Sequence, residues 1–95
     1  MDTEKNFTWF KEVIVTKLKK YEIEYKFSEK GDFGSLNRIG FNNEFKGGYV
    51  DFWSSGWVNI FLVDYIGGDE LLNLLMEPSE KEKINESLEK LVDLL

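Results

Sequence analysis

Hydrophobic and polar residues alternate through the middle of this chain, most clearly between residues 47 and 65. Two apolar runs rich in aromatic and β-branched residues flank Ser54-Ser55-Gly56, which is typical of a β-hairpin. A three-residue hairpin loop usually places its last residue in the left-handed region, where glycine is readily accommodated. We therefore assign Gly56 to that corner of the turn, which predicts that Trp53 lies opposite Trp57.

This register separates the side chains of the hairpin onto two faces. It pairs Asp51 with Asn59 and Tyr49 with Phe61. One face is a uniform core set of Val50, Phe52, Val58, Ile60 and Leu62. The other face is aromatic with a carboxylate and an amide at its centre, and comprises Tyr49, Asp51, Trp53, Trp57, Asn59, Phe61 and Tyr65. A register shifted by one residue would mix the two sets, so we prefer the one that keeps them apart.

Helical periodicity marks both ends of the chain. Residues 3–20 place apolar side chains at steps of three or four, which predicts an N-terminal helix. The stripe consists of Phe7, Phe10, Ile14, Leu18 and Tyr21, widened by Trp9 and Val13. A second helix is predicted after Ser79, which forms a capping-box pattern with Glu82. Its apolar stripe is Ile84, Leu88, Leu91, Val92 and Leu95.

Shorter patterns between the first helix and the hairpin predict further strands. Residues 22–27 alternate strictly and indicate a half-buried strand, residues 28–35 indicate a loop, and residues 36–41 a second strand. The paired glycines Gly47-Gly48 predict a bulge or a close backbone approach. Residues 69–77 suit a short helix or a strand, and we favour an edge strand or irregular segment that ends before Pro78.

Together these elements predict one α+β domain over residues 1–95, in the order α-β-β-β-β-(β)-α. The simplest architecture is an antiparallel meander of four to five strands, with the N- and C-terminal helices on one face. The helices would cover the core face of the hairpin. The aromatic face would then be open, or else covered by Phe33 and its loop or by residues 71–76.

The composition removes most catalytic chemistry. The chain has no cysteine and no histidine, so thiols, disulfides and the commonest general base and metal ligand are all missing. Asp51 and Asp64 are predicted on opposite faces, so they form no carboxylate pair. The acidic clusters lack the ligand spacing of a calcium loop. We therefore expect a protein that is not an enzyme and that has no catalytic residues, no metal site and no cofactor.

The charge narrows the choice of partner. The net charge is −6, and residues 69–95 hold three lysines against eight acidic residues. An acidic chain is poorly suited to a phosphate backbone, so we expect no nucleic acid, but it suits a basic protein or simply solubility. No stretch resembles a signal peptide or a membrane span, so we expect a cytoplasmic protein with no membrane partner.

The order of elements also resembles a known family. Trp53-Ser54-Ser55-Gly56 is followed by an alternating strand ending at Val63-Asp64, a glycine-containing turn and an acidic, Leu-rich terminal helix. This arrangement is similar to the TriTu-type immunity proteins of bacterial polymorphic toxin systems, and the helix leading into a charged alternating strand agrees in layout. The resemblance implies a non-enzymatic antagonist that binds and blocks a cognate toxin in the cytoplasm of the producing bacterium. It identifies no binding residues.

The aromatic face is the candidate binding surface. Monomers seldom expose large apolar patches, and Trp and Tyr are enriched at binding hot spots. We predict that the seven residues of this face bind a protein partner, such as a basic toxin domain, with Asp51 pairing an Arg or Lys of that partner. The alternatives are a small-molecule pocket lined by Tyr49, Trp53 and Trp57, or a self-associating domain of unknown role. The sequence leaves open whether the protein is a monomer or a homodimer.

Overall fold

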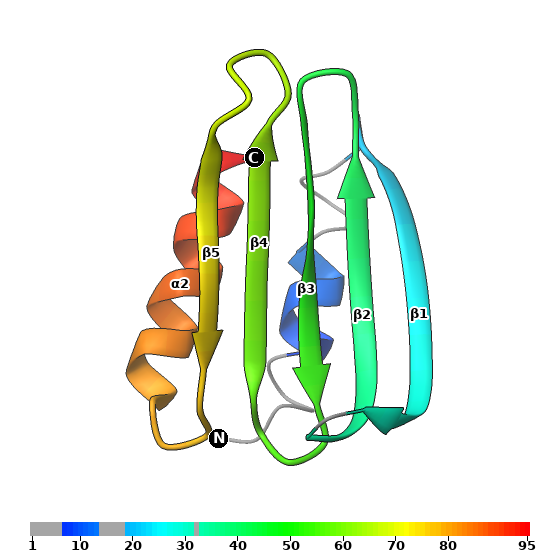
Figure 1. Ribbon diagram of the computed structural model, residues 1–95, viewed down its shortest axis with the longest axis vertical. Helices are drawn as coiled ribbons and strands as arrows, with labels where there is room; N and C mark the ends of the chain where they lie inside the picture. The colour runs from blue at the N-terminus through cyan, green and yellow to red at the C-terminus, as the bar shows by residue number, and fades with distance from the viewer. Residues whose placement is uncertain (1–6, 14–18, 32) are drawn as a thin grey trace.

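The computed structural model describes residues 7–13, 19–31 and 33–95, which form a five-stranded sheet with helices on one face (Figure 1). The strands are β1 (Glu22–Gly31), β2 (Gly34–Asn42), β3 (Lys46–Trp53), β4 (Val58–Asp64) and β5 (Glu70–Met76). All neighbouring strands are antiparallel and follow one another in chain order, so β1 and β5 form the two edges. The predicted α+β meander is confirmed.

The central hairpin has the predicted register. The pairs within it include Asp51 with Asn59 and Tyr49 with Phe61. Gly56 has a φ of 105°, and its N–H donates to the carbonyl oxygen of Trp53 at 2.9 Å. The N–H of Trp53 donates in turn to the carbonyl oxygen of Trp57 at 3.0 Å. The left-handed corner at Gly56 therefore determines which side chains of the hairpin face the core.

The core lies between the sheet and the helices. The predicted set is buried there: Val50, Phe52, Val58, Ile60 and Leu62. The neighbouring strands add Ile39, Phe41, Leu72 and Met76. Helix α2 (Lys81–Leu94) packs Ile84, Leu88 and Leu91 onto this layer. Lys46 donates from its Nζ to the carbonyl oxygen of Leu94 at 2.6 Å, which places a cation at the C-terminal end of α2. Both contacts hold α2 against one face of the sheet.

The N-terminal helix agrees in part with its prediction. Residues 7–13 are helical, and the rings of Phe7 and Phe10 lie 5.5 and 6.0 Å from that of Phe52. Trp9, predicted to widen the apolar stripe, is instead an exposed residue. The predicted end at residue 20 is wrong, because residues 19 and 20 lie in a turn. Residues 14 and 18 of the predicted stripe lie outside the described residues.

The connection between β1 and β2 is shorter than the sequence indicates. A loop over residues 28–35 is wrong in extent, because β1 continues to Gly31 and β2 begins at Gly34. The β1–β2 pairing shifts in register between Ser28 and Gly31, and it resumes beyond this irregularity with Gly31 opposite Gly34. Pairing with β2 holds polar and glycine residues in an extended conformation despite their turn propensity.

The structure decides two alternatives that the sequence left open. Within the predicted segment 69–77, Glu70–Met76 form the edge strand β5, in which Leu72 pairs with Leu62 and Leu74 with Ile60. The β3–β4 pairing is regular at Gly48, so this position is not a bulge but a close approach of two backbones. An added Cβ there would collide with the backbone of β4.

Helix α2 begins without the predicted capping box. Its N-cap residue is Glu80, which makes no side-chain capping hydrogen bond. The Oγ of Ser79 donates instead to the carboxylate of Glu77 at 2.6 Å. The capping assignment of Ser79 is therefore wrong, because the helix begins one residue later than predicted and Glu80 holds the N-cap position.

Replacement of Ser79 tests this difference. We expect Ser79→Ala to change the free energy of unfolding by less than about 0.5 kcal/mol, whereas loss of an N-cap side chain costs about 1 kcal/mol. Urea denaturation followed by circular dichroism measures the change. A loss of about 1 kcal/mol or more would mean that Ser79 caps α2 in solution.

Candidate functional site

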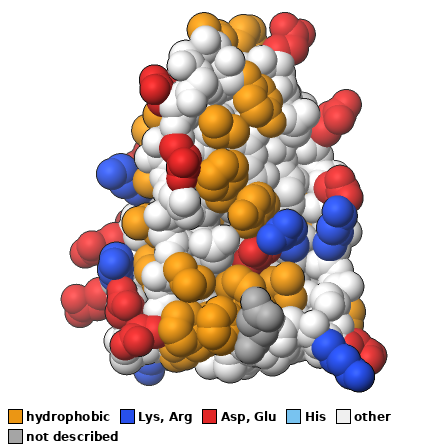
Figure 2. Space-filling model, in the orientation of Figure 1, with side chains coloured by type: hydrophobic (Ala, Val, Ile, Leu, Met, Phe, Trp, Pro, Cys, Tyr) orange, Lys and Arg blue, Asp and Glu red, His pale blue; other side chains and the backbone are white. Residues whose placement is uncertain are grey.

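The sheet face opposite the helices carries the predicted aromatic residues. Figure 2 views the molecule from this side, where hydrophobic side chains extend along the length of the sheet. The strand residues on it include Tyr49, Asp51 and Trp53 of β3 with Asn59 and Phe61 of β4, and Trp57 and Tyr65 flank β4. We call this surface the open face.

One end of the open face is covered by Phe33 from the β1–β2 turn. Its ring stacks on that of Trp57 with 4.2 Å between centroids and meets Trp53 edge-on at 5.2 Å. Hydrogen bonds join the start of β2, directly after this turn, to the β3–β4 turn. They run from Ser54 N–H to Ser35 O at 2.8 Å and from Ser35 N–H to Ser54 Oγ at 3.0 Å. Trp53 is consequently only 8% exposed. The sequence left open whether the aromatic face is exposed or covered within the fold. At this end Phe33 covers it.

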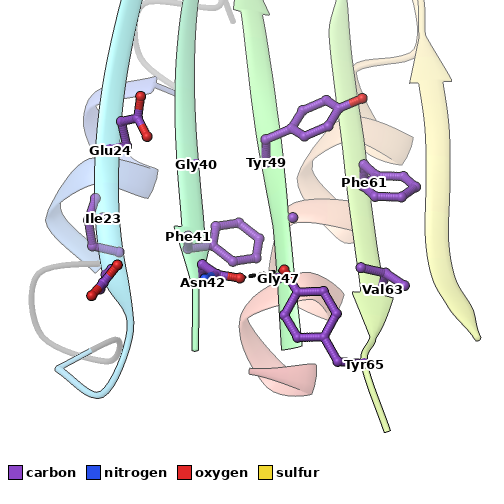
Figure 3. Close-up of a pocket in the computed structure, with 12 residues that line it drawn as sticks. Ile23, Glu24, Gly40, Phe41, Asn42, Gly47, Tyr49, Phe61, Val63 and Tyr65 are labelled. Atoms are coloured by element: carbon purple, nitrogen blue, oxygen red, sulfur yellow. Dashed lines mark hydrogen bonds between the residues drawn. The ribbon is translucent and has the colours of Figure 1, made fainter. Parts of the chain in front are cut away.

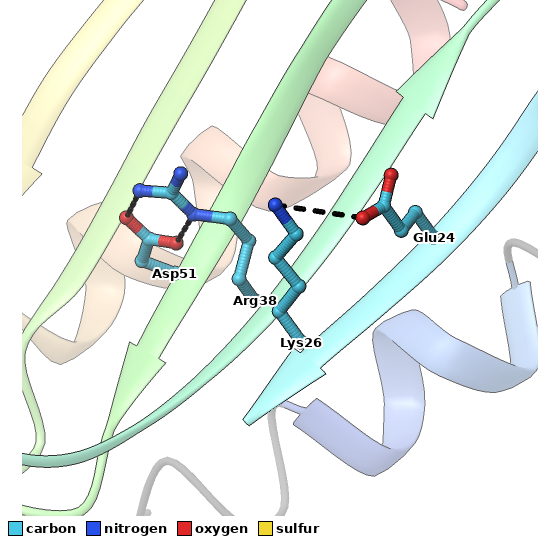
Figure 4. Close-up of polar contacts among 4 residues, drawn as sticks. All are labelled: Glu24, Lys26, Arg38 and Asp51. Carbon is cyan, nitrogen blue, oxygen red and sulfur yellow. Dashed lines mark hydrogen bonds and ion pairs between the residues drawn. The ribbon is translucent and has the colours of Figure 1, made fainter. Parts of the chain in front are cut away.

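The centre of the open face is a salt bridge between β2 and β3 (Figure 4). Arg38 pairs directly across from Asp51, and its Nε and Nη2 donate to the two carboxylate oxygens at 2.5 and 2.9 Å. Asp51 is 1% exposed, and the guanidinium carbon of Arg38 lies 4.0 Å from the centroid of the Tyr49 ring. The hydrogen bond to Asp51 raises the pKa of Arg38 above its ordinary value. The guanidinium is therefore charged throughout the neutral range.

This salt bridge changes the role of Asp51. The sequence predicts that Asp51 pairs with a cation from another protein, but the structure gives it Arg38 of the same chain. The Arg38 side chain is 37% exposed, so the solvent-accessible charge at the centre of the open face is positive. Sequence reasoning missed the pair, although alternation over residues 36–41 already places Arg38 and Gly40 on one face.

The other end of the open face is a shallow groove of about 610 Å³ (Figure 3). Its lining includes Gly40 of β2, whose missing side chain leaves a low point between taller neighbours, and Gly47 of β3, which is buried beneath Tyr65. Tyr49 and Phe61 stack beside the floor with 5.4 Å between their centroids. A glycine next to a pair of stacked rings thus contributes to a hollow on the surface of the sheet.

The rims of the groove are polar. Glu22 and Glu24 of β1 contribute carboxylates on one side. On the other side Tyr65 lies over Gly47, and its hydroxyl donates to the side-chain oxygen of Asn42. The groove therefore combines aromatic rings with negative charge, a chemistry that suits a cationic or amphipathic group.

The structure divides the seven predicted residues into three groups. Tyr49, Phe61 and Tyr65 line the groove. Trp53 and Trp57 lie at the covered end and do not line this groove. The two polar residues lie between these ends: Asp51 in its salt bridge, and Asn59 half-buried between Asp51 and Leu75 on the adjacent strands.

Comparisons of this chain with known families, proteins and structures found no similar protein. No protein-family model, curated protein or solved structure matches this chain at a significant level. Over residues 7–13, 19–31 and 33–95, no helix combines the length and apolar character needed to cross a membrane. Within the same part of the chain, no three acidic, His or Cys side chains are grouped so as to hold a metal ion.

Proposed function

We propose that this protein is a non-enzymatic inhibitor of the immunity type, which binds and neutralises a bacterial toxin through the open face. The observation that supports this most directly is the uncovered half of that face. Stacked Tyr49 and Phe61 stand there beside the groove and beside the half-exposed guanidinium of Arg38. Aromatic and Arg side chains are the ones that most often dominate binding energy at protein interfaces.

The charge of the chain favours a basic partner. The net charge is −6, and Glu22 and Glu24 line one rim of the groove. Opposite charges accelerate the encounter of two proteins and make its rate depend on salt. The resemblance to TriTu-type immunity proteins supports a toxin domain as that partner, so we infer a basic toxin domain.

Removal of one ring of the stacked pair tests the binding surface. We expect Phe61→Ala to weaken partner binding about 30-fold, or about 2 kcal/mol, because the substitution removes a half-buried aromatic anchor and the support of Tyr49. The partner is first identified by mass spectrometry after capture on the tagged protein, and affinity is then measured by titration calorimetry.

The matched control for this variant is Phe27→Ala. Phe27 is an exposed ring of β1 that shares the sheet face of Ile39, away from the groove. It should bind the partner within about twofold of wild type. If Phe61→Ala is folded by circular dichroism and binds as tightly as this control, the open face is not the binding surface.

Inhibition is tested separately from binding. The toxic domain of the captured partner is expressed in a sensitive bacterium, with and without this chain. Wild type should restore growth, and Phe61→Ala should restore it less at equal protein level. A partner whose toxicity is unchanged by wild type would overturn the immunity proposal, even if the two proteins bind.

A second candidate function, small-molecule binding, is favoured by the groove itself. Concave sites that join rings with a few polar groups suit small ligands, and the tyrosines and carboxylates here favour a cationic one. A thermal-shift screen against cationic metabolites addresses it, with Tyr49→Ala as the control that should lose any response. No rise in the melting temperature of wild type across the panel would remove this candidate.

A further inference from the structure

Strand β1 forms one edge of the sheet over ten residues. Within the described chain β2 is its one neighbouring strand, and Figure 1 shows no described element on its outer side. Eight of its ten residues are exposed. Edge strands of this length readily pair with further strands, and proteins usually shorten, bend or cover them.

The helix-side face of β1 carries exposed aromatic rings. Tyr25 is 49% and Phe27 62% exposed. Their pairing with Ile39 and Asn37 of β2 places them on the face that holds the core, beyond the reach of α2. Since a strand added beside β1 would bury such rings against its own side chains, this edge gains apolar contact on pairing.

The opposite face of β1 carries charges of both signs. Glu24 and Lys26 form an ion pair along the strand at 3.5 Å, and both side chains are largely exposed (Figure 4). An exposed pair of this kind contributes little to stability. Little stability is therefore lost if Glu24 pairs instead with an ammonium group, and Lys26 with a carboxylate, on an adjacent strand.

We propose that β1 pairs antiparallel with β1 of a second copy of this chain, about a two-fold axis through Tyr25. In this register Tyr25 lies beside the partner's Tyr25, and Ile23 lies beside the partner's Phe27 on the helix side. On the open-face side Glu24 lies beside the partner's Lys26, and the symmetry makes this pair occur twice. The two sheets become one continuous sheet.

The charges of β1, and the sheet face on which each side chain lies, favour this register over those centred on nearby residues. Registers must differ by two residues to keep apolar side chains beside apolar ones. Centring on Glu24 or on Lys26 would put two identical charges on the axis. Centring on Phe27 would set Tyr25 beside the partner's Glu29. Among these registers, the one centred on Tyr25 pairs opposite charges with one another and rings with apolar side chains.

The dimer is compatible with the proposed inhibitor function, and the two share one residue, because Glu24 also lines the groove. A two-fold axis perpendicular to the sheet leaves both open faces on the same side of the assembly. Each copy would keep its groove accessible, so one dimer could bind two partner molecules.

Charge reversal at two positions tests the register. Glu24→Lys and Lys26→Glu each set like charges opposite one another twice, so we expect each variant to raise the dimer dissociation constant about 30-fold. Mixed in equal amounts, the two variants should form a heterodimer, because every substituted position then faces the opposite charge. The double variant E24K/K26E should dimerise like wild type. Sedimentation velocity of the full chain over a concentration series measures all four samples.

The control applies the same charge change to the other sheet edge. Glu70→Lys reverses a carboxylate at the start of β5 and should leave the dimer unchanged. Because the heterodimer requires two folded variants, its formation also excludes misfolding as the cause of the single losses. A wild type that stays monomeric at high concentration overturns the proposal. So does a dimer that resists both single variants, since its interface would then lie elsewhere.

Discussion

Gly48→Ala is expected to lower the free energy of unfolding by at least about 3 kcal/mol, which for a small domain removes much of the folded population. A methyl group on Gly48 would overlap the carbonyl group of Phe61 and the Cα of Leu62. Both are backbone atoms of the adjacent strand, so they cannot yield as the end of a side chain can. Relief of the clash would require separating β3 from β4, which would disrupt the hairpin that supports the open face.

Gly40→Ala is the matched control for this prediction. Gly40 also lies inside a strand, but an added Cβ would find its nearest atoms at 3.8 and 3.9 Å, in ordinary contact. Alanine also restricts the unfolded chain more than glycine does, so we expect stability to be unchanged or raised by up to about 1 kcal/mol. Urea and thermal denaturation by circular dichroism measure both variants. Equal stabilities for the two would contradict the close approach at Gly48.

Arg38→Ala is expected to cost about 2 to 3 kcal/mol of stability. The substitution leaves the carboxylate of Asp51, which is 1% exposed, without its counter-charge and without two hydrogen bonds. Removal of one partner of a buried pair typically costs about 3 to 5 kcal/mol. The lower figure applies here, because Arg38 is partly exposed and its removal admits water to the carboxylate.

Two further variants, Asp51→Ala and R38M/D51L, distinguish the cost of an unpaired buried carboxylate from a general loss of packing. Asp51→Ala should cost less than Arg38→Ala, because the long side chain of Arg38 can extend into solvent. The double variant R38M/D51L should recover much of the loss, since apolar groups of similar size can replace a buried ion pair. Losses below about 0.5 kcal/mol for both single variants would show that the pair is not formed in solution.

The salt bridge also determines how binding data for this face should be interpreted. Because Asp51 is 1% exposed and paired with Arg38, a weaker partner affinity after Asp51→Ala would report a displaced guanidinium. Phe61 is a more direct probe, because its ring stacks on Tyr49 and lines the groove. For the same reason, the folded state of every variant at the centre of the face must be verified first.

The exposure of the candidate site depended on one residue far along the chain. The alternation over residues 47–65 was enough to collect seven side chains on one face. It gave no means of deciding that Phe33 stacks on Trp57, since this contact requires two turns from separate hairpins to meet. Strand alternation describes orientation, whereas accessibility depends on what packs above the strand.

Local sequence patterns also gave wrong predictions for two segments. Ser79 and Glu82 satisfy the capping-box spacing, but the hydroxyl of Ser79 bonds to Glu77. Residues 28–35 have turn composition, but pairing with β2 extends β1 to Gly31. In the first segment Glu80 holds the N-cap position and leaves Ser79 outside it, and in the second, strand pairing outweighs a weak local preference for a turn.

What the sequence determined by itself was the division of the hairpin into two faces, because a β-strand repeats every two residues and Gly56 sets its corner. This was sufficient for the core set of the hairpin and for the identity of the open face, whereas the meander also required the strand patterns on either side of the hairpin. Tertiary structure alone decided which side chains meet across strands: Arg38 with Asp51, and the backbone of Gly48 with that of Phe61. Such contacts depend on the register of several strands at once, and no local periodicity encodes that combination.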